Sequence, residues 1–176
     1  MNNYSIIKSI AALFVITTLT LSAYGQDTAK WHFSGESVLS YNNSVINLNT
    51  SFEDISKYLG EPTSEKTIPN GDIQYIYESL GMSISVNAEN KVNFVGFNYN
   101  WDGDTRFPET SFKGSLSVGN YTVSKASKPE DFEKIKGVKL KCPIPIICIS
   151  ENENSKSKVL IGFKNGDISQ IGFTFE

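Results

Sequence analysis

The sequence predicts an α+β protein built from two tandem helix-plus-antiparallel-hairpin units, with both helices packed on one face of an antiparallel sheet. Three observations lead to this prediction. Two helical segments resemble each other, strands with alternating apolar residues follow each of them, and the spacing between corresponding segments is nearly constant. Self-similarity of this kind indicates a duplicated supersecondary unit.

Each predicted unit begins with a helix that has its own start and stop signals. The segments "TSFEDISKYLG" (50–60) and "SKPEDFEKIKG" (127–137) open with Thr50 and Ser127, and each has a Glu three positions later. This spacing is that of a capping box, which satisfies free backbone N–H groups at a helix start. A glycine ends each segment, as expected for a left-handed helix end.

Strands with period-two alternation follow each predicted helix. Val95–Tyr99 in the first unit corresponds to Ile171–Phe175 in the second, and both alternate apolar residues with small or polar ones. Such a pattern predicts strands with one buried face. The Asn165-Gly166 pair predicts a tight hairpin turn. A further hairpin is expected around Gly119, ahead of the second helix.

The first 25 residues predict a secretory signal peptide. An apolar run begins at Ile6, and Ala23 and Gly25 are small residues before a cut at Gln26. The run is short for a membrane span of about 20 residues, so cleavage is favoured over an uncleaved anchor. We therefore expect an exported protein, periplasmic or extracellular, without membrane insertion after signal removal.

The mature chain, residues 26–176, is long enough for a single domain with its own core. We expect two repeats in it, at about 44–100 and 112–176, joined by a linker at 101–111. The full chain has 16 Lys and Arg against 19 Asp and Glu, a net charge of −3. Because it is mildly acidic and has no basic cluster, the sequence argues against binding to nucleic acid.

One stretch resembles known modules. "ISKYLGEP" (55–62) is followed by "IQYIYESLGMSISVNAENKVNFVGFNY" (73–99). A helix ending in Leu-Gly-x-Pro, then a Tyr-x-Tyr strand and a hairpin, resembles the outer-membrane assembly lipoprotein module and is similar to the doubled module of the β-lactamase-inhibitor protein. The mature chain as a whole resembles an uncharacterised domain family of exported bacterial proteins. The resemblance implies a non-enzymatic binding scaffold and assigns no functional residue. The chain lacks the lipidation cysteine, so membrane tethering is not implied.

No residue pattern identifies a catalytic centre, so we expect a non-enzyme. His32 is the only histidine and lies beside Trp31, which favours a structural histidine over a triad base. Metal sites that need two or three histidines are excluded by this count. A carboxylate pair would leave no signature in the sequence, so a small carboxylate-dependent hydrolase is an alternative.

The stretch "NYNWDGDTRFPE" (98–109) has the spacing of a calcium loop, with a glycine at its sixth position. The possible metal ligands are Asn98, Asn100, Asp102 and Glu109. An uncharged first ligand, a proline before the last one and strands on both sides favour a linker over this calcium site. No other cofactor is expected.

The two cysteines, Cys142 and Cys148, lie in "CPIPIIC". A straight strand would place them about 20 Å apart, beyond the reach of a disulfide. A turn at Pro143 and Pro145 would bring them together, and an exported protein meets an oxidising compartment. The sequence is compatible with a disulfide and with two separate buried cysteines.

Four aromatic residues are candidates for binding a protein partner. Tyr75 and Tyr77 share one face of a predicted strand, and Tyr99 and Trp101 lie at the boundary between the units. If exposed, they would anchor a partner, and the alternative is a small satellite core. We expect an exported, non-catalytic protein-binding scaffold. A second possibility is an inhibitor or immunity protein for an extracytoplasmic enzyme.

Overall fold

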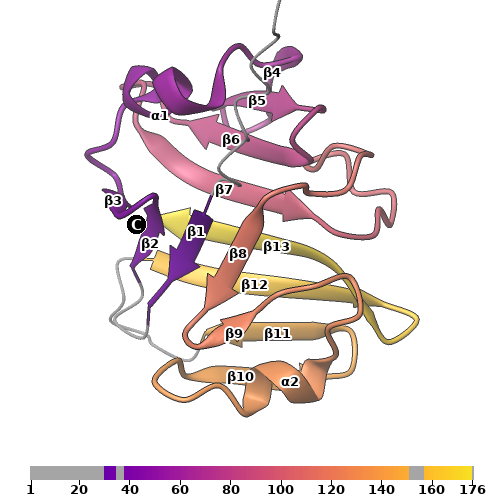
Figure 1. Cartoon of the computed structure of the whole chain (residues 1–176). Coiled ribbons are helices and arrows are strands. Elements are labelled where there is room, and N and C mark those ends of the chain that lie inside the picture. Colours follow the sequence, from indigo (N-terminus) through magenta and orange to yellow (C-terminus); the bar gives the residue numbers. More distant parts are fainter. Residues whose placement is uncertain (1–29, 35–37, 151–156, 176) are drawn as a thin grey trace, which may run out of the picture.

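Strands make up most of the structure. The computed structural model describes residues 30–34, 38–150 and 157–175 (Figure 1). The predicted signal peptide, residues 1–25, lies outside the described residues. Within the described ranges, no helix has the length and apolar character needed to cross a membrane.

The larger sheet has eight strands, in the order β10-β11-β12-β13-β7-β6-β5-β4, and all neighbours in it are antiparallel. The strands are β4 (Ser64–Thr67), β5 (Ile73–Tyr77), β6 (Met82–Val86), β7 (Val92–Asn98), β10 (Leu140–Ile144), β11 (Ile147–Ser150), β12 (Ser157–Lys164) and β13 (Asp167–Phe175). They form two four-stranded meanders, which meet at their last strands, β7 and β13.

The smaller sheet joins distant parts of the chain, in the order β3-β2-β1-β8-β9. Its strands are β1 (Lys30–Phe33), β2 (Leu39–Tyr41), β3 (Ser44–Ile46), β8 (Ser115–Val118) and β9 (Tyr121–Thr122). β1 pairs in parallel with β8, with Trp31 opposite Leu116. The expected hairpin around Gly119 is the β8–β9 turn, where Gly119 has a φ of 56°.

The hydrophobic core lies between the two sheets. The smaller sheet covers the centre of one face of the larger sheet, which we call the covered face (Figure 1). Trp31 of β1 contacts Phe97 of β7, with ring centroids 5.1 Å apart, and Phe33 contacts Phe173 of β13 at 4.9 Å. All four rings are almost fully buried, so aromatic packing holds the sheets together.

The predicted fold class is wrong, because a second sheet replaces the expected helical layer. The only helices in the described residues are α1 (Phe52–Leu59) and α2 (Pro129–Glu133), which lie near opposite ends of the larger sheet (Figure 1). Segments 44–48 and 111–123 precede the two helices and contain strands, as their sequences predict. These strands belong to the second sheet around the N-terminal strand β1, and such distant pairing leaves no local sequence pattern.

The predicted helix starts are each displaced by one residue. The N-cap of α1 is Ser51, whose Oγ accepts a hydrogen bond from the Asp54 N–H at 3.2 Å, while the Asp54 carboxylate accepts from the Ser51 N–H. In α2 the N-cap is Lys128, whose N–H donates to the Asp131 carboxylate at 2.9 Å. Because α2 ends at Glu133, it is shorter than the predicted segment.

Replacing Ser51 with alanine should lower the free energy of unfolding by about 1 kcal/mol, since the Asp54 N–H then loses its partner. Urea denaturation measures this loss. Ser56→Ala removes the same atom within the same helix, where the hydroxyl only donates back to the Glu53 carbonyl. An equal loss in both variants would contradict a capping role for Ser51.

The two halves of the chain share one order of elements. α1 precedes the meander β4–β7, and α2 precedes the meander β10–β13. The covered face includes the predicted apolar positions of both terminal strands, among them Val95 and Ile171, which are fully buried. The duplication itself stays a prediction from the sequence.

Candidate functional site

The opposite face of the larger sheet, which we call the open face, has no sheet packed on it within the described part of the chain. Directly paired residues form a row across six strands on this face. From β11 to β5 the row is Ile149, Leu160, Gly172, Gly96, Ser83 and Ile76. Two adjacent glycines at its centre create a shallow depression in the sheet.

The loop between β7 and β8, residues 99–114, crosses the open face at this depression. The Phe107 ring is 5% exposed and packs edge-to-face on Phe94, with centroids 5.9 Å apart. A Cβ on Gly96 would lie 2.7 Å from the Phe107 ring, so the close approach requires glycine. The Arg106 carbonyl accepts hydrogen bonds from Gln74 Nε2 and Ser83 Oγ, each at 2.7 Å. These contacts fix the predicted linker on the sheet.

An ion pair lies within this loop. The Asp104 carboxylate accepts hydrogen bonds from the Arg106 guanidinium, the shortest being Nη2 to Oδ2 at 2.7 Å, and Gln170 Nε2 lies 3.3 Å from Oδ2. Burial acts to raise the pKa of Asp104, but the hydrogen bonds and charge of Arg106 outweigh it and lower that pKa below its ordinary value. The same hydrogen bond raises the pKa of Arg106. Asp104 is therefore held ionised.

An apolar groove of about 280 Å³ lies beside the loop on the open face. Its walls include Phe94, Phe107, Ile149 and Leu160, and we call it the apolar half of the open-face groove. Ile149 and Leu160 face each other across β11 and β12 and are 39% and 40% exposed. Exposed aliphatic side chains beside an aromatic wall are typical of a binding surface.

A second hollow of about 340 Å³ continues from the first, and we call it the polar half of the open-face groove. The two halves share the lining residues Phe94, Arg106 and Thr174. Beyond these, the polar half is lined mainly by hydrogen-bonding side chains. They are Asn70, Asp72, Gln74, Ser85 and Asn93.

The four aromatic candidates do not form one exposed patch. Tyr77 and Tyr99 are 1% and 4% exposed, and burial raises the pKa of Tyr77 to about 12 and also raises that of Tyr99. Tyr75 is half-buried and stacks on Phe52 of α1, with centroids 3.8 Å apart. Trp101 alone is exposed. The predicted alternation is correct, but the face that it defines is the covered one.

Three of the candidate calcium ligands make hydrogen bonds that hold the loop. Asn98 is fully buried, and its Nδ2 donates to the backbone carbonyls of Glu109 and Thr110. Asn100 Nδ2 donates to Ile168 O at 2.7 Å, and Asp102 Oδ1 accepts from the Asp104 N–H. Asn98 and Asn100 thus use their amide Nδ2 atoms to hold the loop, and the calcium site stays a prediction.

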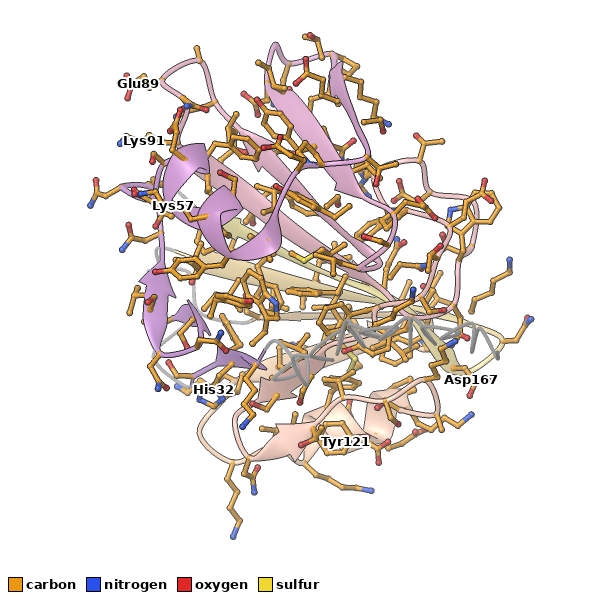
Figure 2. The ribbon with its side chains drawn as sticks, turned by 45° about the horizontal axis from the view of Figure 1, so that its top comes forward. His32, Lys57, Glu89, Lys91, Tyr121 and Asp167 are labelled. Carbon is orange, nitrogen blue, oxygen red and sulfur yellow. A yellow bond between two sulfur atoms is a disulfide. The ribbon has the colours of Figure 1, made fainter. Side chains whose placement is uncertain are left out.

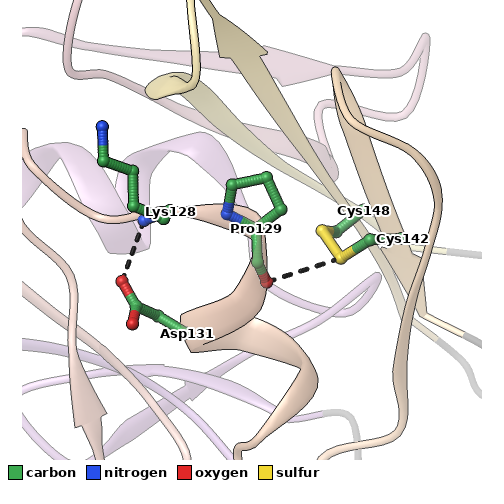
Figure 3. Close-up of a disulfide and its surroundings, with 5 residues drawn as sticks. All are labelled: Lys128, Pro129, Asp131, Cys142 and Cys148. Atoms are coloured by element: carbon green, nitrogen blue, oxygen red, sulfur yellow. Dashed lines mark hydrogen bonds between the residues drawn. A yellow bond between two sulfur atoms is a disulfide. The ribbon is translucent and has the colours of Figure 1, made fainter.

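Cys142 and Cys148 form a disulfide across the β10–β11 hairpin, with their Cα atoms 4.0 Å apart (Figure 3). The chain turns at Pro145 and Ile146, so the bent arrangement applies. Cys148 is fully buried, and Cys142 Sγ lies 3.7 Å from the Pro129 carbonyl at the start of α2. The disulfide therefore lies where the hairpin meets the helix.

His32 is at the surface of the smaller sheet (Figure 2). Its Nδ1 lies 2.8 Å from the Oγ of Ser117 on the neighbouring strand β8. No carboxylate contacts His32 among the described residues, so this pair lacks the third group that orients a triad histidine. In the same residues, no three His, Cys, Asp or Glu side chains are grouped as a metal site would require.

The open-face groove was missed at the sequence level, although one signal for it was present. Glycine interrupts both "VGF" at Gly96 and "IGF" at Gly172, in the middle of alternating strands. A glycine inside a strand marks a bulge or the close approach of another group. Here the group is the ring of Phe107, together with Phe94.

Fold and site together define a mostly β, two-sheet protein with a groove on the open face of its larger sheet. The chain belongs to the family described as "Domain of unknown function (DUF7738)", which matches residues 32–133. The match begins in β1 and ends in α2, so it includes the first meander and the loop that forms the groove wall.

A comparison with curated proteins gives no match. A similar solved structure is the crystal structure of a DUF4309 family protein (YjgB) from Bacillus subtilis subsp. subtilis str. 168, with 15% identity over 77% of this chain and 84% of that chain and a TM-score of 0.43. The resemblance to the assembly lipoprotein and the β-lactamase-inhibitor protein is not tested by these findings and stays a prediction.

Proposed function

We propose that the protein is an extracytoplasmic, non-catalytic binding protein that holds a segment of a protein partner in the open-face groove. One observation is decisive for this proposal. Ile149 and Leu160 are each about 40% exposed and share one groove with the rings of Phe94 and Phe107. Covering apolar side chains with another apolar surface releases water and favours association.

The ion pair in the loop beside the groove makes Asp104 unsuited to acid catalysis. A carboxylate-dependent hydrolase needs one carboxyl group that keeps its proton and donates it to the leaving group. Asp104 lies in the loop that forms the groove wall, and Arg106 lowers its pKa. An ionised carboxylate in a bidentate ion pair is suited to holding the loop, and it cannot act as a general acid.

The disulfide supports an extracytoplasmic location. Structural disulfides persist in oxidising compartments and are rare in the reducing cytosol. The Cys142–Cys148 disulfide agrees in this respect with the predicted signal peptide. Export nevertheless belongs to the proposal, and reduction-sensitive migration of the protein recovered from the cell envelope would test it.

Selection of a displayed heptapeptide library on the purified protein tests whether the groove binds peptides. Peptides that bind the native protein should bind Leu160→Glu about tenfold more weakly or worse, because the new charge lies in the apolar half. Val45→Glu is the matched control, since Val45 is 52% exposed on β3 of the other sheet. Circular dichroism spectra should be the same for all three proteins.

Either of two results would overturn the proposed function. One is a selection that enriches no peptide above the bare support. The other is a set of peptides that bind the native protein and both variants equally. If a later search finds that the partner is an enzyme and that binding blocks its activity, the protein is an inhibitor.

A further inference from the structure

We infer that the open-face groove binds an extended peptide segment that places a lysine or arginine side chain in the polar half and apolar side chains in the apolar half. This inference rests on the proposed function and adds the chemistry of the partner. Three observations lead to it: the two halves are continuous, the polar half has acceptors without partners, and a single carboxylate lies in that half.

The two halves form one trough. Phe94 and Thr174 line both, and they are directly paired between β7 and β13. The trough runs across the strands from β11 to β5, which is five strand spacings, or about 24 Å. An extended chain of about seven residues has this length. A compact small molecule would fill one half only.

Gln74 has an acceptor without a donor. Its Nε2 donates to the Arg106 carbonyl at 2.7 Å. This bond fixes which side of the Gln74 amide is the nitrogen, because an amide oxygen in that position would have no hydrogen to donate to the carbonyl. Its Oε1 is then buried without a hydrogen-bond partner among the described residues, and the residue is 1% exposed. Buried acceptors are normally satisfied, so a donor from a ligand would complete this one.

Asn93 repeats the arrangement. Its Nδ2 donates to the Asp72 carboxylate at 2.7 Å, and its Oδ1 is buried without a partner in the described part of the chain. The strand register accounts for its position. Val92 pairs with Val86 and Phe94 with Ser85, so Asn93 is an extra residue in β7. Such a bulge re-aims side chains, and here it places Asn93 in the polar half while Val92 stays in the core.

Asp72 supplies the charge. Its Oδ2 accepts from Asn70 Nδ2 at 2.6 Å and from Asn93 Nδ2, whereas no hydrogen bond reaches Oδ1 from the described residues. Arg106 is the cation that lines the same half, and Asp104 on its own loop neutralises it. The polar half therefore has three oxygen acceptors without a hydrogen-bond partner among the described residues, two of them buried, and one carboxylate outside the ion pairs of these residues.

These acceptors suit a cationic side chain. A lysine ammonium has three donors and no acceptor, and an arginine guanidinium has five donors. Each has an apolar stem that could pass over Phe94, which lies between the halves. A carboxylate or a phosphate in the polar half would meet hydrogen-bond acceptors instead of donors, and the Asp72 carboxylate would repel it. The polar half thus selects a basic residue, and the neighbouring half takes apolar ones.

Two displayed heptapeptide libraries test the inference, one with all amino acids and one without Lys and Arg. Groove-dependent peptides, defined by weaker binding to Leu160→Glu, should come only from the complete library. Replacing their Lys with norleucine, or their Arg with citrulline, should weaken binding to the native protein about tenfold in fluorescence polarisation. This step changes only the ligand and cannot disturb the fold.

Variants of the protein locate the effect. Asp72→Asn should weaken binding of the cationic peptide about tenfold. It should leave the affinity for the norleucine or citrulline form of the same peptide unchanged. Glu133→Gln, which removes the same charge from an exposed position on α2, should change neither. The difference between native protein and Asp72→Asn should shrink at high salt.

The outcomes separate this inference from the proposed function. Groove-dependent peptides of equal affinity from the library without Lys and Arg would overturn the cation inference and leave the binding function standing. So would a cationic peptide that binds Asp72→Asn and the native protein equally. A failure of both libraries to yield groove-dependent peptides would overturn both proposals.

Discussion

Replacing Phe97 with alanine is expected to lower the free energy of unfolding by about 3–5 kcal/mol. Phe97 is fully buried at the centre of β7. Its ring contacts Trp31 of the smaller sheet at 5.1 Å, Phe112 at 4.8 Å and Phe173 of β13 at 5.9 Å. A cavity at this position would loosen the contact between the sheets and the pairing of the two meanders.

Phe94→Ala is the matched control for this change. Phe94 belongs to the same strand, but it is half-buried on the open face, where its main ring contact is with Phe107. Its loss should cost less stability and should instead weaken peptide binding. Equilibrium urea denaturation compares the two variants. If Phe94→Ala were the more destabilising, the core would not lie between the sheets.

Removing the disulfide should lower the free energy of unfolding by about 2 kcal/mol, the effect expected for closing a short loop in the unfolded chain. The double variant Cys142→Ser/Cys148→Ser tests this, because it leaves no unpaired thiol. Separation of the hairpin from α2 would add to the loss, since Cys142 lies against the Pro129 carbonyl.

The measurement uses denaturation with and without a reductant. The native protein should lose stability when the reductant is added, and the double variant should not respond. Hydrogen exchange should also rise locally in β10 and β11 of the variant. A native protein equally stable in both conditions would show that the cross-link contributes nothing to folding.

Local chemistry explains which parts of the fold were predictable. The strands around Val95 and Ile171 follow from period-two alternation, because one face of each is buried whatever covers it. The Asn165-Gly166 turn follows from the left-handed φ angles that it requires, 56° and 83°. Both signals are contained within a few neighbouring residues.

The covering layer could not be predicted in the same way. An apolar strand face indicates burial, but it does not say whether a helix or a second sheet buries it. The pairing of Trp31 with Leu116 depends on contacts between segments far apart in sequence. Neither segment has a local feature that predicts its pairing with the other. The sequence therefore predicts that the helices cover the sheet, whereas the smaller sheet covers it.

The candidate site shows a second limit. Asn98 and Asn100 have the residue types and spacing of cation ligands, and in the structure the Nδ2 of each donates to a backbone carbonyl, which no local pattern predicts. An amide has donors and an acceptor, and the sequence does not say which is used. Asp72 and Asn93 are conversely unremarkable in sequence, and only a β-bulge brings them together.

The central position of β1 has a consequence for the order of folding. β1 lies between β2 and β8, and its paired residues His32 and Ser117 are separated by 85 positions. During synthesis on the ribosome, Trp31 of β1 is made early. Its parallel partner strand, β8, is made only after more than 80 further residues. Such long-range pairing slows folding. The newly made chain should therefore stay unfolded, and accessible to chaperones, until most of its second half has been made.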